Sequence, residues 1–169
     1  MHKRVAILAE DDCEDLELWY PLIRLKGAGH EVVVVGSGRK EVFHSKHGYE
    51  VKADLPTPKA KVGDLDALVI PGGFAPDRLR RFTAVNELVK QMHQNGKLVA
   101  AICHAPSVLI SANILRGRKV TCFTSIKDDV MNAGVRYLDE AVVVDVNIIT
   151  ARGPADLPEF MKEILQALR

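Results

Sequence analysis

The stretch that decides the fold of this chain reads Leu98-Val99-Ala100-Ala101-Ile102-Cys103-His104-Ala105-Pro106-Ser107-Val108-Leu109. Its first five residues form an apolar run of the length and kind that a strand buried on both faces requires. A helix is expected from Ala105 to Ala112, so the chain must turn abruptly at Cys103 and His104. Such a strand-to-helix turn projects its central side chain out of the sheet and needs small neighbours, here Ala101 and Ala105.

Similar apolar runs recur along the chain and alternate with helical patterns. Strands are expected at Val5–Ala9, Glu31–Val35, Asp66–Ile70 and Leu98–Ile102, with a short one at Lys119–Phe123 and hairpins at 42–52 and 141–150. Helices are expected at 14–25, Ala84–Gln94, Ala105–Ala112, Ile126–Ala133 and Pro154–Leu168. This alternation predicts an α/β fold, with a mostly parallel sheet between two layers of helices, as one domain spanning 1–169.

The overall composition excludes several classes of function. The chain has 169 residues, 47% hydrophobic and 27% charged, and its formal net charge is +1. Such a balance gives no reason to expect nucleic acid or an anionic membrane as a partner. No apolar run approaches the length of a signal peptide core or a membrane span, which predicts a cytoplasmic protein. The three cysteines fit neither a zinc spacing nor a disulfide framework, so each is expected to be a free thiol, and the hydrolase chemistry expected below requires no metal or organic cofactor.

Three polar features follow expected strands and should meet at the carboxyl edge of the sheet, where α/β proteins place their sites. They are the acidic loop leading to Glu14, the turn Pro71-Gly72-Gly73, and Cys103-His104. The N-terminus of the following helix would favour the thiolate of Cys103, and nearby backbone N–H groups could bind an oxyanion. The residues alone also allow a buried core thiol at Cys103 and a simple helix first-turn acid at Glu14.

The turn Gly36-Ser37-Gly38 is not followed by a helical pattern, which disfavours dinucleotide binding.

A series of motifs spanning nearly the whole chain resembles the ThiJ/PfpI superfamily, and within it the PfpI branch of intracellular cysteine hydrolases. The motifs are Glu14-Asp15-Leu16-Glu17, Gly29-His30-Glu31-Val32, Lys46-His47-Gly48-Tyr49, Leu68 to Asp77, Ala101 to Pro106, Ile126 to Asp129, Asn132-Ala133-Gly134 and Pro154 to Leu157. Each is weak alone, but their common order is specific.

The resemblance implies a flavodoxin-like three-layer sandwich related to class I glutamine amidotransferase domains. It implies that Cys103 is the nucleophile, that Glu14 hydrogen-bonds near the sulfur, and that His104 is the adjacent catalytic histidine. The backbone N–H groups of Gly73 and His104 match the family's oxyanion hole. A third catalytic member, an acid, comes from a neighbouring subunit and matches Asp77, where relatives usually carry the longer glutamate.

The resemblance also implies a function and an assembly. We expect a cysteine-dependent hydrolase acting on methylglyoxal or on glyoxal-derived adducts of amino and thiol groups in stress defence. A peptidase acting on small peptides is the alternative enzyme, and a redox-sensing or chaperone-like stress protein is the alternative that is not an enzyme. Donation of Asp77 across an interface would require a homo-oligomer, with a dimer as the minimum and a hexamer of three dimers as the larger form. A second departure from the family is Ala105, where glycine is common; its methyl group would tighten the turn or narrow the pocket.

Overall fold

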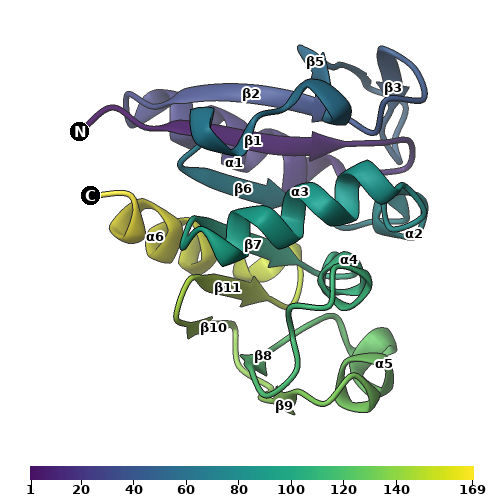
Figure 1. Ribbon diagram of the computed structural model, residues 1–169, viewed down its shortest axis with the longest axis vertical. Helices are drawn as coiled ribbons and strands as arrows, with labels where there is room; N and C mark the ends of the chain where they lie inside the picture. Colours follow the sequence, from purple (N-terminus) through teal and green to yellow (C-terminus); the bar gives the residue numbers. More distant parts are fainter.

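A seven-stranded sheet forms the centre of the computed structural model, which describes residues 1–169 (Figure 1). In spatial order the strands are β10 (Val142–Asp145), β11 (Ile148–Ala151), β7 (Leu98–Ile102), β6 (Ala67–Ile70), β1 (Arg4–Ala9), β2 (Glu31–Gly36) and β5 (Leu55–Pro56). All neighbouring pairs are parallel except the hairpin β10–β11. The predicted mostly parallel α/β sheet is therefore confirmed.

Helices cover both faces of this sheet. They are α1 (Asp15–Gly27), α2 (Ala75–Leu79), α3 (Thr83–Gln94), α4 (Pro106–Ser111), α5 (Lys127–Asn132) and α6 (Leu157–Ala167). Helices α1 and α6 pack against each other on one face, and α3 and α4 pack on the other (Figure 1). The central strands β6 and β7 are buried at every position, as a strand between two helix layers must be. None of the helices has the length and apolar character needed to cross a lipid bilayer.

Short elements surround the sheet. The hairpin of β3 (Val42–His44) and β4 (Glu50–Lys52) lies beyond β2, and β8 (Lys119–Val120) pairs in parallel with β9 (Arg136–Tyr137). One-turn 3-10 helices occur at Thr57–Lys59, Val62–Asp64, Thr124–Ile126 and Pro154–Asp156. The chain ends lie at the opposite edge, away from α2 and α4 (Figure 1).

Two local differences from the sequence-based expectations affect the site. The strand expected at Lys119–Phe123 ends at Val120, because the Phe123 backbone N–H donates instead to the carbonyl of Cys103 (3.0 Å). The short helix α2, which carries Asp77, follows the turn after β6 and was not expected, because five residues carry too little periodicity to be seen.

Candidate active site

The turn between β7 and α4 places Cys103 in a left-handed backbone conformation, with φ +64°. This region costs a residue with a Cβ about 1–2 kcal/mol, so the surrounding structure must hold the turn. The Cys103 backbone N–H donates to Ala151 of β11, and its carbonyl accepts from Phe123, both at 3.0 Å. The predicted sharp strand-to-helix turn is present, and backbone contacts on two sides support it.

The glycine turn after β6 packs directly against this elbow. A Cβ on Gly72 would lie 2.6 Å from Cys103 Cβ and 2.9 Å from the Ile102 carbonyl oxygen, so only glycine fits there. Gly73 has φ +73°, which glycine adopts without strain. The sequence-based expectation that this turn and Cys103 meet at one edge of the sheet agrees with the structure.

Two backbone N–H groups converge on the sulfur of Cys103. Those of Gly73 and His104 both act on the thiol as hydrogen-bond donors and lower its pKa, against the larger opposing effect of burial. Neither N–H donates to a backbone carbonyl, so both remain available. Paired donors beside a nucleophile have the geometry that stabilises an oxyanion, the role predicted for Gly73 and His104.

The His104 imidazole contacts the Cys103 sulfur through one ring nitrogen and the Ser125 hydroxyl through the other. Its Nδ1 lies 3.2 Å from Cys103 Sγ, and its Nε2 lies 2.9 Å from the Ser125 hydroxyl. The Phe123 ring stacks on it at 5.0 Å between centroids, and Phe74 lies tilted at 6.2 Å. Burial lowers the pKa of His104 below its ordinary value, so the ring is neutral at pH 7 and able to accept a proton.

A buried carboxyl group, that of Glu17 on α1, lies beside the thiol. Glu17 is fully buried, and its Oε2 accepts a hydrogen bond of 2.7 Å from the Gly72 N–H. Its Oε1 is buried without a conventional hydrogen-bond partner, and the Cys103 thiol is the neighbouring polar group. Burial raises the pKa of Glu17 to about 7, which leaves the carboxyl partly protonated near neutral pH. Glu17 and Cys103 therefore form a coupled pair that can share a proton.

The residue expected at this place was Glu14, and here the structure corrects the sequence-based assignment. Glu14 precedes α1, and its carboxylate lies 3.3 Å from Lys46 Nζ rather than at the sulfur. Glu17 lies three positions further along, on the buried face that also carries Leu18 and Pro21. A charged residue within an otherwise apolar helix face is a signal for Glu17, but Glu14 shares the helical spacing of Leu18, so this signal alone does not separate the two.

The thiol itself is less acidic than its place before a helix suggests. Burial, reinforced by the Glu17 charge, raises the pKa of Cys103 to about 12. Desolvation therefore opposes the preference for thiolate that the helix N-terminus and the N–H groups favour. Cys13 and Cys122 are also free and buried, and burial raises the pKa of each to about 12. What distinguishes Cys103 from the other two is the neighbouring imidazole and N–H donors, since burial raises the pKa of all three thiols.

Replacing Glu17 with glutamine should change how stability depends on pH. The pKa of Glu17 is about 7 in the folded chain against an ordinary value of 4.5, so between these values the folded state holds a proton that the unfolded chain releases. The free energy of unfolding therefore falls as pH rises through this window, by up to about 3 kcal/mol, and the Glu17→Gln protein loses this slope. Urea denaturation from pH 4.5 to 8 measures it, with Glu140→Gln as an exposed control. Equal slopes in wild type and Glu17→Gln would contradict the assignment.

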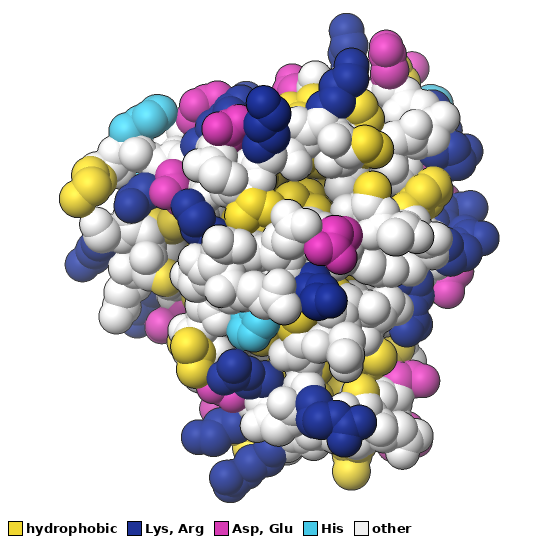
Figure 2. All heavy atoms as spheres, viewed as in Figure 1, with side chains coloured by type: hydrophobic (Ala, Val, Ile, Leu, Met, Phe, Trp, Pro, Cys, Tyr) yellow, Lys and Arg dark blue, Asp and Glu magenta, His cyan; other side chains and the backbone are white.

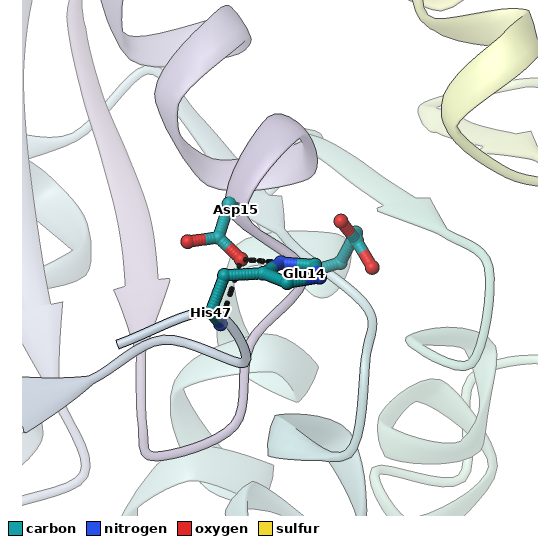
Figure 3. A group of neighbouring side chains, drawn as sticks. All are labelled: Glu14, Asp15 and His47. Carbon is teal, nitrogen blue, oxygen red and sulfur yellow. Dashed lines mark hydrogen bonds and ion pairs between the residues drawn. The ribbon is translucent and has the colours of Figure 1, made fainter. Parts of the chain in front are cut away.

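A cluster of Glu14, Asp15 and His47 lies at the rim, with its ligand-type atoms within 4.8 Å of one another (Figure 3). Both oxygens of Asp15 are already used: one accepts from the Ser45 hydroxyl, and the other contacts the His47 backbone N–H at 3.2 Å and Nδ1 at 2.6 Å. These bonds fasten the β3–β4 hairpin to the start of α1. The cluster thus explains how the hairpin brings Lys46 to the mouth of the site.

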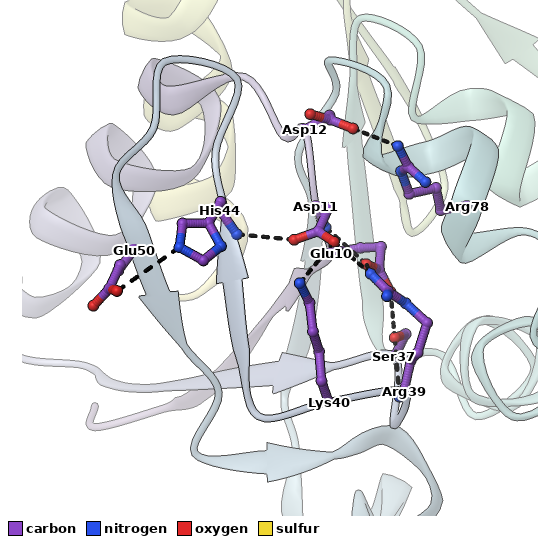
Figure 4. Close-up of polar contacts among 9 residues, drawn as sticks. All are labelled: Glu10, Asp11, Asp12, Ser37, Arg39, Lys40, His44, Glu50 and Arg78. Atoms are coloured by element: carbon purple, nitrogen blue, oxygen red, sulfur yellow. Dashed lines mark hydrogen bonds and ion pairs between the residues drawn. The ribbon is translucent and has the colours of Figure 1, made fainter.

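The acidic loop after β1 is neutralised by basic residues that follow β2 and by α2 (Figure 4). Glu10 is fully buried, accepts from the Ser37 hydroxyl and pairs with Arg39 at 2.7 Å. Asp12 pairs with Arg78 at 2.5 Å. Because the Ser37 hydroxyl is directed to Glu10, the turn Gly36-Ser37-Gly38 supports the acidic loop. On the face shown in Figure 2, acidic and basic side chains are interspersed.

The sheet, the strand-to-helix turn and its neighbours together define the class of the protein: an α/β protein with a cysteine on a strained turn beside a histidine. The family model described as the DJ-1/PfpI family matches residues 3–167. The chain belongs to this family.

Several known proteins show the same relationship. Deglycase PfpI of Pyrococcus furiosus is 45% identical over 98% of this chain and 99% of its own length. A Bacillus subtilis protein named "Putative cysteine protease YraA" is 41% identical over the full length of both chains. Among solved structures, Drosophila melanogaster DJ-1beta has a TM-score of 0.90 at 29% identity, covering 97% of this chain and 89% of its own. A two-domain protein of Anabaena variabilis, containing a DJ-1/ThiJ/PfpI-like and a ferritin-like domain, has a TM-score of 0.96 at 49% identity, covering 98% of this chain and 48% of its own.

Proposed function

We propose that this protein is a cysteine-dependent hydrolase that converts methylglyoxal, or adducts of glyoxals with amino and thiol groups, into a hydroxy acid. The observation that carries the proposal is the convergence on one sulfur of an imidazole nitrogen at 3.2 Å and two backbone N–H groups that donate to no carbonyl. The 45% identity to a deglycase of Pyrococcus furiosus supports the substrate class. A thiol enzyme of this kind suits the reducing cytoplasm, and all three cysteines are free.

The chemistry starts with transfer of the Cys103 proton to His104 Nδ1, and the backbone N–H groups of Gly73 and His104 stabilise the thiolate that results. The sulfur then attacks the aldehyde carbon of methylglyoxal, and the oxygen that becomes negative binds the N–H groups of Gly73 and His104. Moving a proton from C1 to C2 of the adduct gives a thioester, which water hydrolyses to lactate and free thiol. The sum is methylglyoxal plus water to lactate, which balances without an oxidant or reductant.

A peptidase remains the second candidate, because the same thiol and N–H groups would acylate on a peptide carbonyl and a relative is named as a protease. The redox-sensor alternative is less well supported by the site. Cys103 is only 7% exposed and its pKa is raised, whereas oxidation by peroxide favours exposed thiolates.

One preparation tests the proposal and separates the two enzymes. Lactate formation should be measured from methylglyoxal and from its adducts with N-acetyl-cysteine and N-acetyl-arginine, alongside cleavage of fluorogenic peptides. We expect turnover of the glyoxal substrates, with the Cys103→Ala protein as the control for contaminants. Peptide cleavage that depends on Cys103, without glyoxal turnover, would favour the peptidase instead.

We further propose that the protein acts as a homo-oligomer in which Asp77 of one subunit supports the site of its neighbour. Asp77 lies on α2 at the rim of the site, is exposed, and forms no ion pair or side-chain hydrogen bond within its own chain. The adjacent Phe74 side chain is 63% exposed. An exposed acid beside an exposed aromatic ring is consistent with an edge that a second subunit covers.

Mixing two inactive variants tests this donation. The Asp77→Ala and Cys103→Ala proteins are each expected to have strongly reduced activity, but a hybrid dimer combines an intact Cys103 with an intact Asp77 from the other subunit. Co-expression at equal levels should restore about a quarter of the wild-type sites, by random pairing in a two-fold dimer. Activity that stays at the sum of the two variants would place the role of Asp77 within its own chain.

A further inference from the structure

We infer that Ser125 is a positioning residue that holds the His104 imidazole in the tautomer able to deprotonate Cys103. The inference rests on the hydrolase function proposed above and adds to it a residue from outside the motifs that carry the chemistry. Its basis is a chain of contacts: Cys103 Sγ to His104 Nδ1 at 3.2 Å, and His104 Nε2 to the Ser125 hydroxyl at 2.9 Å.

The tautomer of the neutral His104 ring is defined by which of its two nitrogens carries the hydrogen. A neutral imidazole has one N–H and one lone pair, and only the nitrogen with the lone pair can accept a proton from the thiol. If the Ser125 oxygen accepts from Nε2–H, the lone pair stays on Nδ1, which faces the sulfur. The same hydrogen bond persists after proton transfer, because the imidazolium also carries a proton on Nε2. Ser125 thus favours both the state before and the state after deprotonation.

The segment that carries Ser125 is fixed to the nucleophile rather than free at the surface. The Phe123 backbone N–H donates to the Cys103 carbonyl at 3.0 Å, and the Phe123 ring stacks on His104 at an interplanar angle of 27°. The 3-10 helix Thr124–Ile126 then starts directly after this anchor. This short segment therefore orients the His104 imidazole through three groups: the Phe123 backbone, the Phe123 ring and the Ser125 hydroxyl.

Within the chain, the Ser125 hydroxyl is the hydrogen-bonding partner of His104 Nε2. The charged and titratable neighbours are Lys46 from the β3–β4 hairpin, whose charge disfavours imidazolium, and the Cys103–Glu17 pair below it. Phe74 and Phe123 flank the ring and offer no acceptor. Both ring nitrogens are thus engaged within the chain.

The experiment compares Ser125→Ala, Ser125→Thr and, as the matched control on the same turn, Thr124→Ala, whose exposed hydroxyl bonds to no side chain in the structure. Nitrogen-15 NMR of the histidine rings reads the tautomer, and mass spectrometry of the Cys103 peptide follows alkylation by iodoacetamide from pH 5 to 9. We expect Ser125→Ala to mix the tautomers and to slow alkylation near pH 7 about fivefold, the value of one ordinary hydrogen bond. We expect the acid limb of its pH profile to move to lower pH. Ser125→Thr should restore both, and Thr124→Ala should change neither.

The outcomes separate this inference from the proposed hydrolase. An unchanged His104 tautomer in Ser125→Ala, failure of threonine to restore it, or an equal effect in Thr124→Ala would overturn the role of Ser125. A uniform slowing at every pH without a change of tautomer would show a structural role only and would also overturn it. If the wild-type protein turns over none of the substrates, the hydrolase proposal fails while the NMR and alkylation results still decide the role of Ser125.

Discussion

Replacing Cys103 with alanine is expected to reduce turnover of glyoxal substrates by about 10⁴-fold or more, to the background of the assay. No other thiol is placed to replace it, because Cys13 and Cys122 are buried at 1% exposure and lack the neighbouring imidazole. Steady-state lactate formation, with the variant at a thousandfold higher concentration than wild type, measures the residual rate. Equal rates in the two proteins would remove Cys103 from the mechanism.

The Cys103→Gly protein provides the matched control for folding. Alanine keeps the left-handed backbone of φ +64° at the cost of strain, whereas glycine adopts it freely. We expect both variants to be inactive, and the glycine variant to be more stable than the alanine variant by about 1 kcal/mol in urea denaturation. A more stable alanine variant would mean that the elbow is not strained.

Replacing Gly72 with alanine should damage both stability and activity, although position 72 takes no direct part in bond making. The added methyl group would lie 2.6 Å from Cys103 Cβ, 2.9 Å from the Ile102 carbonyl oxygen and closer still to Glu17 Oε2. Backbone atoms supply part of this crowding, so the turn and the elbow must separate. We expect a loss of about 3 kcal/mol in the free energy of unfolding and about 10² in kcat/KM.

A control glycine makes this prediction specific. At Gly63 a Cβ would meet nothing within 4 Å and φ is not positive, so Gly63→Ala should change stability by no more than about 0.5 kcal/mol. Thermal and urea denaturation of both variants, together with thiol alkylation at Cys103, measure the effects. If Gly72→Ala is as stable and as reactive as Gly63→Ala, the close packing of turn and elbow is not essential.

The sequence was sufficient for the fold because its strands are continuous apolar runs. Val5–Ala9 and Leu98–Ile102 have no other stable place than the middle of a covered sheet, and their alternation with helices sets the parallel order. Local sequence patterns fail to predict secondary structure where contacts with distant residues determine the backbone conformation. Thr121–Phe123 has the composition of a strand, yet Phe123 pairs with the Cys103 carbonyl, a contact across 20 residues that no local pattern contains.

The same distinction holds within the site. Cys103, His104 and Gly73 could be placed together because each follows a strand of one parallel sheet, and their ends share an edge. Choosing between Glu14 and Glu17 required the rotation of α1 about its axis, which the buried positions Leu18, Pro21 and Leu22 define. Ser125 could not be found from sequence, because its position depends on where the chain leaves β8. The raised pKa of Cys103 depends on burial, which the helix start alone does not reveal.

The two chain ends have a practical consequence. Lys3 and Leu168 line one shallow hollow at the amino edge of the sheet, and the site lies at the carboxyl edge (Figure 1). A short linker could therefore join the ends, and new ends opened in an exposed loop would give a circular permutant with the site intact. A partner domain or a solid support attached at either end would face away from Cys103 and leave the route of small molecules to the sulfur open.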